Sequence, residues 1–363
     1  MPRGYSTRGD IVEQTIDGRP LDEVWNEFSQ TLDLLNQSRS AFTALLCYPT
    51  TASAEAIPQT TSRDDFEEAS EFGIPKSLRT NPDVLIMGFD FRDYDSRSAY
   101  TWKFLRDAPA SQVQATHNLQ LEADNRLTTG MVLRRLLDNT HWENEENNTV
   151  YGLYSGDGIV PPEFGGRTFD GNHTHYLTTQ GALEAVDLED TIAKVTEHGY
   201  GTAQGTRILV FAHPDQMRAI RRFRANQTAA DGGVSSFDFI PSSNAPAYLT
   251  NEQIVGERAP GEYLNLPIAG SYGPAWVIEM PSLPTGYVPV VATGGVNSQF
   301  NAVGFREHKT PTYRGLRLIP GPREGYPLVD SFYSRSFGVG IAHRGAAAVI
   351  QVTNSANYTR PAL

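Results

Sequence analysis

One segment has residue types and a spacing that could bind a metal ion: residues 170–175, which read Asp-Gly-Asn-His-Thr-His. His173 and His175 are two positions apart, so on a strand both imidazoles would share one face, and Asp170 could add a carboxylate. No further ligand follows close by in the sequence. We therefore expect a structural or surface role for these residues, and we assign no metal ligand.

The rest of the chain contains no recognisable catalytic or cofactor-binding motif. Residues 156–158, 199–201 and 338–340 are Gly-x-Gly pairs that lack the third glycine of a dinucleotide-binding loop. The sequence has no P-loop, no Gly-x-Ser-x-Gly and no His-Glu-x-x-His, and no spacing of carboxylates singles out an acid and a base. His213 precedes Pro214 and is expected to cap a helix. The absence of such a motif in a chain of this length favours a structural protein.

Charge is distributed unevenly along the chain. The net charge is −12, and residues 1–72 carry thirteen acidic residues against five arginines. An acidic chain binds DNA poorly, because affinity for phosphates comes from lysine and arginine. Docking onto basic surfaces and solubility at high concentration are the roles that this balance favours.

A polar ribbon, residues 50–96, is the most informative segment. It has few large apolar residues, and Pro58, Pro75 and Pro82 interrupt any long helix. An ordered arm of this composition cannot form its own core, so it must pack on another protein surface. We expect that surface to belong to another copy of the chain. Its acidic run would then dock on arginines of that copy. The candidate inter-subunit contacts are Asp64, Asp65, Glu67, Glu68, Glu71, Lys76, Arg218, Arg221 and Arg222.

The arginines at 218–224 form the densest basic cluster. Three roles stay open for it: contact with packaged nucleic acid, salt bridges to a neighbour, or a simply solvated face, and the last two are the more common. The single cysteine, Cys47, excludes disulfides within the chain and follows an apolar helical stretch, so we expect it to be buried. No apolar run is long enough to cross a membrane, and the first residues contain no signal-like apolar region.

Hydrophobic periodicity predicts the elements that must position these residues. Helices are expected at 20–46, 98–107, 111–138 and 187–198 and after residue 213, with Pro109 breaking the second from the third. Strands are expected at 84–94, as half of a long hairpin, at 207–211, and as a pair within 337–355 joined at residues 343–345. Residues 225–247 read as a loop. The helix at 111–138 has one apolar stripe and suits the spine of a flat, elongated molecule.

This order of elements resembles the major capsid proteins of tailed double-stranded DNA bacteriophages, whose fold is shared with the herpesvirus capsid floor. Two stretches are most specific: RILVFAHPDQMRAIRRF at 207–223, and FGVGIAHRGAAAVIQVTNS at 337–355. The first is similar to the strand, x-Pro-x-x and helix of that family's axial domain. The second is similar to its closing strand pair.

The resemblance implies an α+β fold with an N-terminal arm and helix (1–48), an extended β-hairpin loop (49–97), a peripheral domain (98–184 and, on return, 301–363) and an axial domain (185–300). The spine helix would lie in the peripheral domain. It implies a structural subunit that self-assembles, through hexameric and pentameric capsomers, into an icosahedral shell around phage DNA. Such a subunit would have no enzyme activity and no cofactor.

The partners that the resemblance implies are other copies of the chain, a separate scaffolding protein, a portal and a decoration protein. DNA would be contacted only non-specifically, and no membrane is involved. The location would be the virion, after assembly in the host cytoplasm. Two rival readings stay open from the sequence: a phage tail or baseplate protein, and a soluble hydrolase built from scattered acids and histidines.

Overall fold

The computed structural model describes residues 11–37, 40–58, 68, 71, 73, 84–243, 258–321 and 327–363. The chain forms two compact units. Unit 1 comprises Met1–Ser40, Phe91–Met131 and Arg306–Gly338, and unit 2 comprises Ala41–Asp90, Val132–Phe305 and Val339–Leu363. Three elements contain residues of both units: α4 (Ala110–Leu137), β15 (Val303–Glu307) and β17 (Leu328–Ile341). None of the helices in the described ranges is long and apolar enough to cross a membrane.

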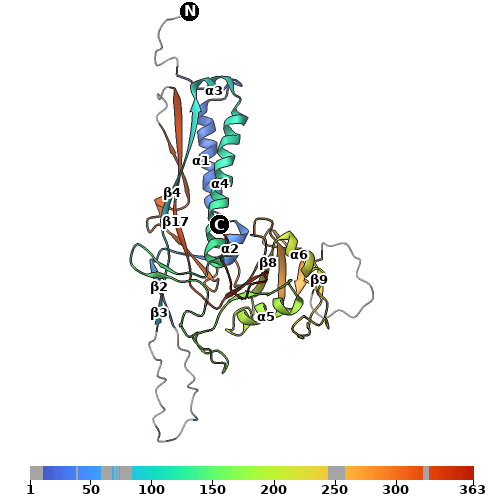
Figure 1. Cartoon of the computed structure of the whole chain (residues 1–363). Helices are drawn as coiled ribbons and strands as arrows, with labels where there is room; N and C mark the ends of the chain where they lie inside the picture. The colour runs from blue at the N-terminus through green and yellow to red at the C-terminus, as the bar shows by residue number, and fades with distance from the viewer. Residues whose placement is uncertain are drawn as a thin grey trace, which may run out of the picture. The chain divides into compact units, whose positions relative to one another are not determined.

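Unit 1 packs helices against an antiparallel sheet. Figure 1 shows α1 (Leu21–Gln37) and α4 running alongside β4 (Arg92–Thr101) and β17. β17 lies between β4 and β16 (Leu316–Pro320), with Leu328 opposite Thr101 and Leu316 opposite Arg335. The remaining elements of this unit are α3 (Trp102–Asp107) and a short 3-10 helix (Pro311–Tyr313).

The core of unit 1 forms where the apolar stripe of α1 meets the start of α4. Its buried residues are Leu21, Val24, Phe28, Tyr100, Leu105, Ala110, Val113 and Val329. Burial of this stripe supplies most of the stability of α1, because propensity alone rarely stabilises a helix of this length.

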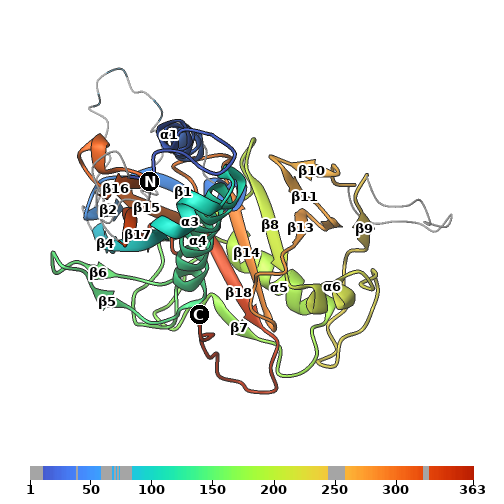
Figure 2. The same cartoon turned by 90° about the horizontal axis from the view of Figure 1, so that it is seen from above.

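Unit 2 contains a seven-stranded sheet, whose order is β7-β18-β14-β8-β13-β12-β9. Figure 2 shows several of its strands side by side. The strands are β7 (Tyr176–Thr178), β8 (Arg207–Ala212), β9 (Phe239–Pro241), β12 (Gly270–Tyr272), β13 (Ala275–Glu279), β14 (Tyr287–Thr293) and β18 (Ala347–Gln351). β8 is central and pairs in parallel with β13 and antiparallel with β14. A central strand is covered on both faces, which explains why its residues from Ile208 onward are all buried.

Helices cover the two faces of this sheet. α5 (Ala185–Thr196) and α6 (Pro214–Ile220) pack on the face that carries Ile208 and Val210. α2 (Ala41–Leu46) packs on the other face, where the ring of Phe42 meets Phe211 edge-on at 5.2 Å. The other elements of unit 2 are β1 (Cys47–Thr50), β2 (Ala54–Pro58), β3 (Val84–Gly88), β5 (Trp142–Glu143), β6 (Thr149–Val150), β10 (Glu262–Tyr263) and β11 (Leu266–Pro267).

Most predicted elements are confirmed, including the long helix, which runs from Ala110 to Leu137. Cys47 is buried, and the His213 imidazole accepts a hydrogen bond from the Asp215 amide (3.2 Å), so it caps α6 as expected.

Four expectations were wrong in detail. The helix predicted at 20–46 is two helices, because α1 ends at Gln37 and α2 begins at Ala41. Residues 98–101 continue β4, since pairing with β17 overrides their local helical pattern. The predicted loop at 225–247 contains β9. The last two strands are not partners: β17 pairs with β4 and β16, while β18 pairs with β14 and β7.

Candidate functional site

Two strands within the ribbon form a regular antiparallel hairpin, which we call the stem. β2 and β3 pair in register from Ala54↔Gly88 to Pro58↔Val84. The hairpin expected for residues 84–94 is therefore confirmed for 84–88, with β2 as its partner. The stem fixes the two points from which the intervening ribbon leaves unit 2.

Hydrogen bonds attach the base of the stem to the rest of unit 2. The buried side-chain amide of Asn144 donates to the carbonyl of Ser53 (3.0 Å), directly before β2, and to that of Phe89 (2.9 Å), directly after β3. Gly88 approaches the loop before β6 so closely that an added Cβ would lie 2.8 Å from the Asn148 carbonyl oxygen. Any larger residue at 88 would push the stem off this support.

Side chains fix the first strand of the stem as well. Tyr48 donates to one oxygen of the Glu55 carboxylate (2.5 Å) and Thr50 to the other (2.8 Å). Burial, reinforced by this carboxylate, raises the pKa of the Tyr48 hydroxyl, so it stays protonated and remains a donor.

The predicted inter-subunit contacts fall partly on the ribbon. Asp64, Asp65, Glu67 and Lys76 lie outside the described residues, and Glu68 and Glu71 are exposed. Their role as contacts stays a prediction.

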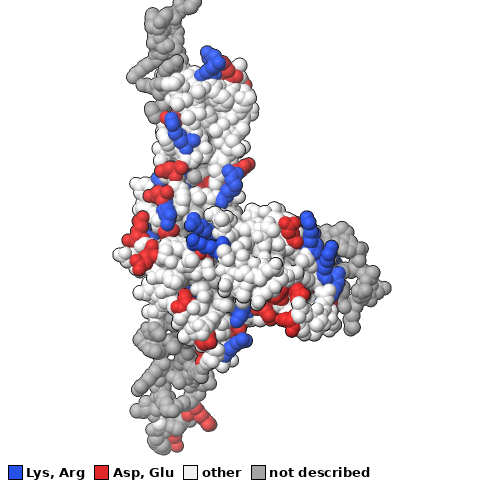
Figure 3. Space-filling model, viewed as in Figure 1, with Lys and Arg blue, Asp and Glu red and all other residues white. Residues whose placement is uncertain are grey.

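The arginine cluster lies at and after α6. Figure 3 shows a row of blue side chains on the flank where Figure 1 labels that helix. Arg221 pairs with Glu279 on β13 at 2.5 Å, and Arg218 lies 3.6 Å from Asp215. Arg224 donates to backbone carbonyls of its own turn. Arg222 is exposed. These contacts use only part of the donors of each guanidinium, and the role of the cluster as an inter-subunit contact stays a prediction.

A histidine cluster lies in unit 2 beside β18. The Nε2 atoms of His173, His175 and His198 are each 3.0 Å from the other two. The Oε1 atom of Glu197 lies 3.3 Å from the Nε2 atom of His173. His173 and His175 precede β7, whereas Glu197 and His198 follow α5. Gly199, at a φ of +83°, turns the chain directly after His198. Asp170, the third candidate from the sequence, instead accepts the Asn172 amide and is not one of the four residues of the cluster.

Burial controls the charge of these histidines. Desolvation lowers the pKa of His173, lowers that of His175 far below its usual range, and lowers that of His198 to about 3. Neighbouring imidazoles lower the pKa of His175 and His198 further, because a second positive charge would lie beside the first, and the charge of Lys194 lowers the pKa of all three histidines. At neutral pH the three imidazoles of the cluster are therefore uncharged.

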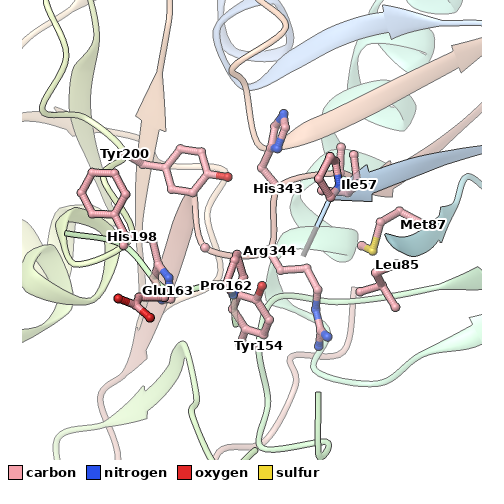
Figure 4. A pocket seen from close by; sticks show the side chains of 14 residues that line it. Ile57, Leu85, Met87, Tyr154, Pro162, Glu163, His198, Tyr200, His343 and Arg344 are labelled. Carbon is pink, nitrogen blue, oxygen red and sulfur yellow. The ribbon is translucent and has the colours of Figure 1, made fainter. Parts of the chain in front are cut away.

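A pocket of about 230 Å³ lies beside the cluster (Figure 4). The stem contributes Ile57, Leu85 and Met87, and the opposite wall includes Tyr154, His198 and Tyr200. Arg344 also lines it. Its guanidinium donates to the carbonyls of Gly152 (2.9 Å) and Leu153 (3.0 Å), and it pairs with Asp157 (2.5 Å). The arginine of the His-Arg-Gly turn thus fixes the segment that carries Tyr154.

Comparison of the sequence with protein-family models and with curated proteins finds no match. Among solved structures, the capsid of an empty GTA particle is 12% identical over 87% of this chain and 91% of that chain, with a TM-score of 0.49. The mature capsid of bacteriophage PhiM1 is 11% identical over 88% of each chain, with a TM-score of 0.47. A structure from Mycobacterium phage Patience is 38% identical over 99% of this chain and 96% of that chain, with a TM-score of 0.73.

The chain belongs to the major capsid proteins of tailed double-stranded DNA bacteriophages. This capsid protein is a structural subunit that self-assembles into the icosahedral shell enclosing phage DNA, and its location is the virion capsid. The predicted α+β capsid fold and the predicted role are confirmed, and the tail or baseplate reading is set aside.

Sequence reasoning missed half of the histidine cluster of this capsid protein. Glu197 and His198 are adjacent and end the helix predicted at 187–198, which is the one local signal that could have drawn attention to them. The two halves of the cluster meet because β7 and α5 both lie beside β18. Sequence spacing does not reveal that proximity.

Proposed function

We propose that the capsid subunit builds hexameric and pentameric capsomers in which the part of the ribbon between the stem strands, residues 59–83, lies over a neighbouring subunit. The observation that carries this proposal is the stem itself. Its paired strands, the Asn144 hydrogen bonds and the close approach at Gly88 hold both ends of the ribbon to unit 2. Because both ends of residues 59–83 are anchored to unit 2, a contact between these residues and a neighbouring subunit would hold the two subunits together.

The chemistry of the contact follows from charge. We propose that the acidic residues of the ribbon dock on arginines of the neighbouring subunit; they are Asp64, Asp65, Glu67, Glu68 and Glu71. We propose that Arg218, Arg221 and Arg222 are also inter-subunit contacts. Lys76 would lie at the same contact as the acidic residues without forming a covalent bond. An exposed ion pair contributes only about 0–1 kcal/mol. In a shell each pair recurs at every symmetry-related position, and weak contacts then act together.

The remaining partners are proposed on the family resemblance: a separate scaffolding protein, a portal and a decoration protein, with DNA touched non-specifically and assembly in the host cytoplasm. We also propose that the subunit performs no catalytic step.

The register of the stem gives a clean way to remove the ribbon. Because Pro58 pairs with Val84, residues 59–83 can be replaced by Asn-Gly, which favours the tight turn of a two-residue hairpin. The variant retains the stem and β4 and should keep its circular dichroism spectrum. Electron microscopy should find no closed shells under conditions in which the parent chain assembles. Closed shells from this variant would contradict the role of the ribbon.

A second experiment tests the acidic contact separately. Replacing the five ribbon acids by Asn or Gln should raise the protein concentration needed for assembly and reduce its dependence on salt. A matched control removes five exposed charges elsewhere: Glu13, Glu23, Asp33, Glu122 and Glu143. If both variants need the same protein concentration for assembly and depend equally on salt, net charge governs assembly and docking of the ribbon does not.

A further inference from the structure

We propose that His173, His175, His198 and Glu197 form a binding site for one divalent transition metal ion, of which zinc fits the donor set best. The four potential ligand atoms lie within 4.8 Å of one another. Three imidazoles and one carboxylate are a donor set that zinc accepts in a tetrahedral arrangement.

The distances suit such an ion without a change in the imidazole positions. The three Nε2 atoms form a triangle with 3.0 Å sides. An ion about 1 Å off the plane of this triangle lies at the roughly 2.0–2.1 Å that a zinc–imidazole bond requires. The Glu197 carboxylate would complete the tetrahedron.

Hydrogen bonding alone does not satisfy this triangle. Each Nε2 carries either a hydrogen or a lone pair, and a hydrogen bond needs one of each. Among three mutually adjacent nitrogens, at least one pair must therefore bring two hydrogens or two lone pairs together. A central cation removes the conflict, because all three nitrogens can then present lone pairs.

The surroundings favour the ligand form of the side chains. The Nδ1 atom of His175 lies 2.6 Å from the Ala347 carbonyl oxygen, to which it donates, so the Nε2 atom of its neutral ring carries the lone pair. A backbone carbonyl on the outer nitrogen is the usual partner of a metal-binding histidine.

Glu197 supplies the fourth donor and the negative charge. Its side chain is 5% exposed, and its Oε2 atom pairs with Arg167 at 2.7 Å. Its Oε1 atom is buried and has no hydrogen-bond partner among the described residues; it lies 3.4 Å from the Lys194 amine. Arg167 thus orients the carboxylate with one oxygen directed toward the histidines.

The site would be structural. With four protein ligands the ion has no open position for a substrate, as in structural zinc sites. Phe169 stacks on the ring of His198 with centroids 4.2 Å apart, which shields that side from water. The ion would link the segment before β7 to the end of α5, and both of these lie next to β18. Binding of the ion would therefore stabilise the seven-stranded sheet of unit 2.

Metal content of the full-length chain tests the proposal directly. The protein should be expressed in medium that contains zinc and then separated from unbound metal by gel filtration. Mass spectrometry should then find about one zinc ion per subunit. Chelation should lower the melting temperature, and zinc should restore it whereas magnesium should not, because magnesium prefers oxygen ligands. Cobalt substitution should give the visible absorption of a tetrahedral site. Chains without stoichiometric metal, whose melting does not respond to zinc, would overturn the proposal.

Variants identify the ligands. His198→Gln should abolish stoichiometric binding, and Arg167→Gln should weaken zinc binding by about 10- to 100-fold through loss of carboxylate orientation. His141→Gln is the matched control, because His141 is exposed and outside the cluster. If the His198→Gln variant binds as much zinc per subunit as the His141→Gln control, the ion is bound at another site and the proposal is wrong. If His198→Gln does not fold, the metal content and cobalt spectrum of the parent chain decide.

Discussion

At the scale of single residues, His117 is a buried titratable group at the centre of contacts within unit 1. Its ring stacks on Phe28 with centroids 4.0 Å apart and planes 6° apart, and its Nδ1 atom lies 2.7 Å from the Tyr333 hydroxyl. It therefore joins α1, α4 and β17 at one point. Burial lowers the pKa of His117 from about 6.5 to about 4. The folded state thus holds this imidazole neutral in a pH range where the unfolded chain protonates it.

This difference predicts acid sensitivity. Because the pKa in the folded state is the lower one, the contribution of His117 to stability is present above pH 6.5 and declines as the pH falls toward 4. At pH 5 the loss should be about 2 kcal/mol. Denaturant unfolding of His117→Gln at pH 7 and pH 5 should show a smaller decline than the parent chain. The histidines of unit 2 remain in both proteins and cancel in the comparison. Equal declines would contradict the prediction.

At the scale of elements, a charged contact fixes α4 against the sheet of unit 1. Arg335 on β17 and Asp124 on α4 pair at 2.5 Å, and both side chains are at most one-tenth exposed. Burial raises the pKa of Asp124, and the nearby Arg335 charge opposes that rise. A pair in such a place specifies one alignment of helix and strand, because either charge alone would be buried without compensation.

Breaking this pair should cost far more than replacing it. Asp124→Asn should lower the free energy of unfolding by roughly 3–5 kcal/mol, whereas Asp124→Leu combined with Arg335→Met should recover most of that loss. The exposed pair of Arg97 and Asp330 is the control. Its removal by Arg97→Gln should cost no more than about 1 kcal/mol. A double variant as unstable as the single one would show that the charges themselves are required.

At the scale of the whole molecule, the chain offers little chemistry for joining subunits covalently. It has four lysines and one cysteine. Cys47 is fully buried, which removes it from any disulfide between subunits. An isopeptide bond needs a lysine amine made neutral by burial, and Lys76 on the ribbon follows a proline in a polar sequence. We therefore expect the shell to be held by non-covalent contacts.

Gel electrophoresis tests this expectation. Mature particles boiled in detergent, with and without reductant, should give a single band near 40.0 kDa. A ladder of larger species that disappears on Lys76→Ala would overturn it and identify Lys76 as a reactive residue.

The sequence by itself determined the features that depend on neighbours along the chain. The long helix Ala110–Leu137 follows from its composition and the breaker Pro109, and the cap of α6 follows from His213-Pro214. The buried strand β8 follows from its continuous apolar run. These local signals were also sufficient to suggest the capsid family, because their order along the chain is distinctive.

Only the tertiary structure decided which distant segments meet. The sequence predicts β17 and β18 as a pair, yet one pairs with β4 and the other with β14, because the apolar pattern of a strand specifies its buried face and not its partner. The same limit hid the histidine cluster. His173 and His198 come within 3.0 Å through the way β7 and α5 lie against β18, and that placement is set by burial of the whole sheet.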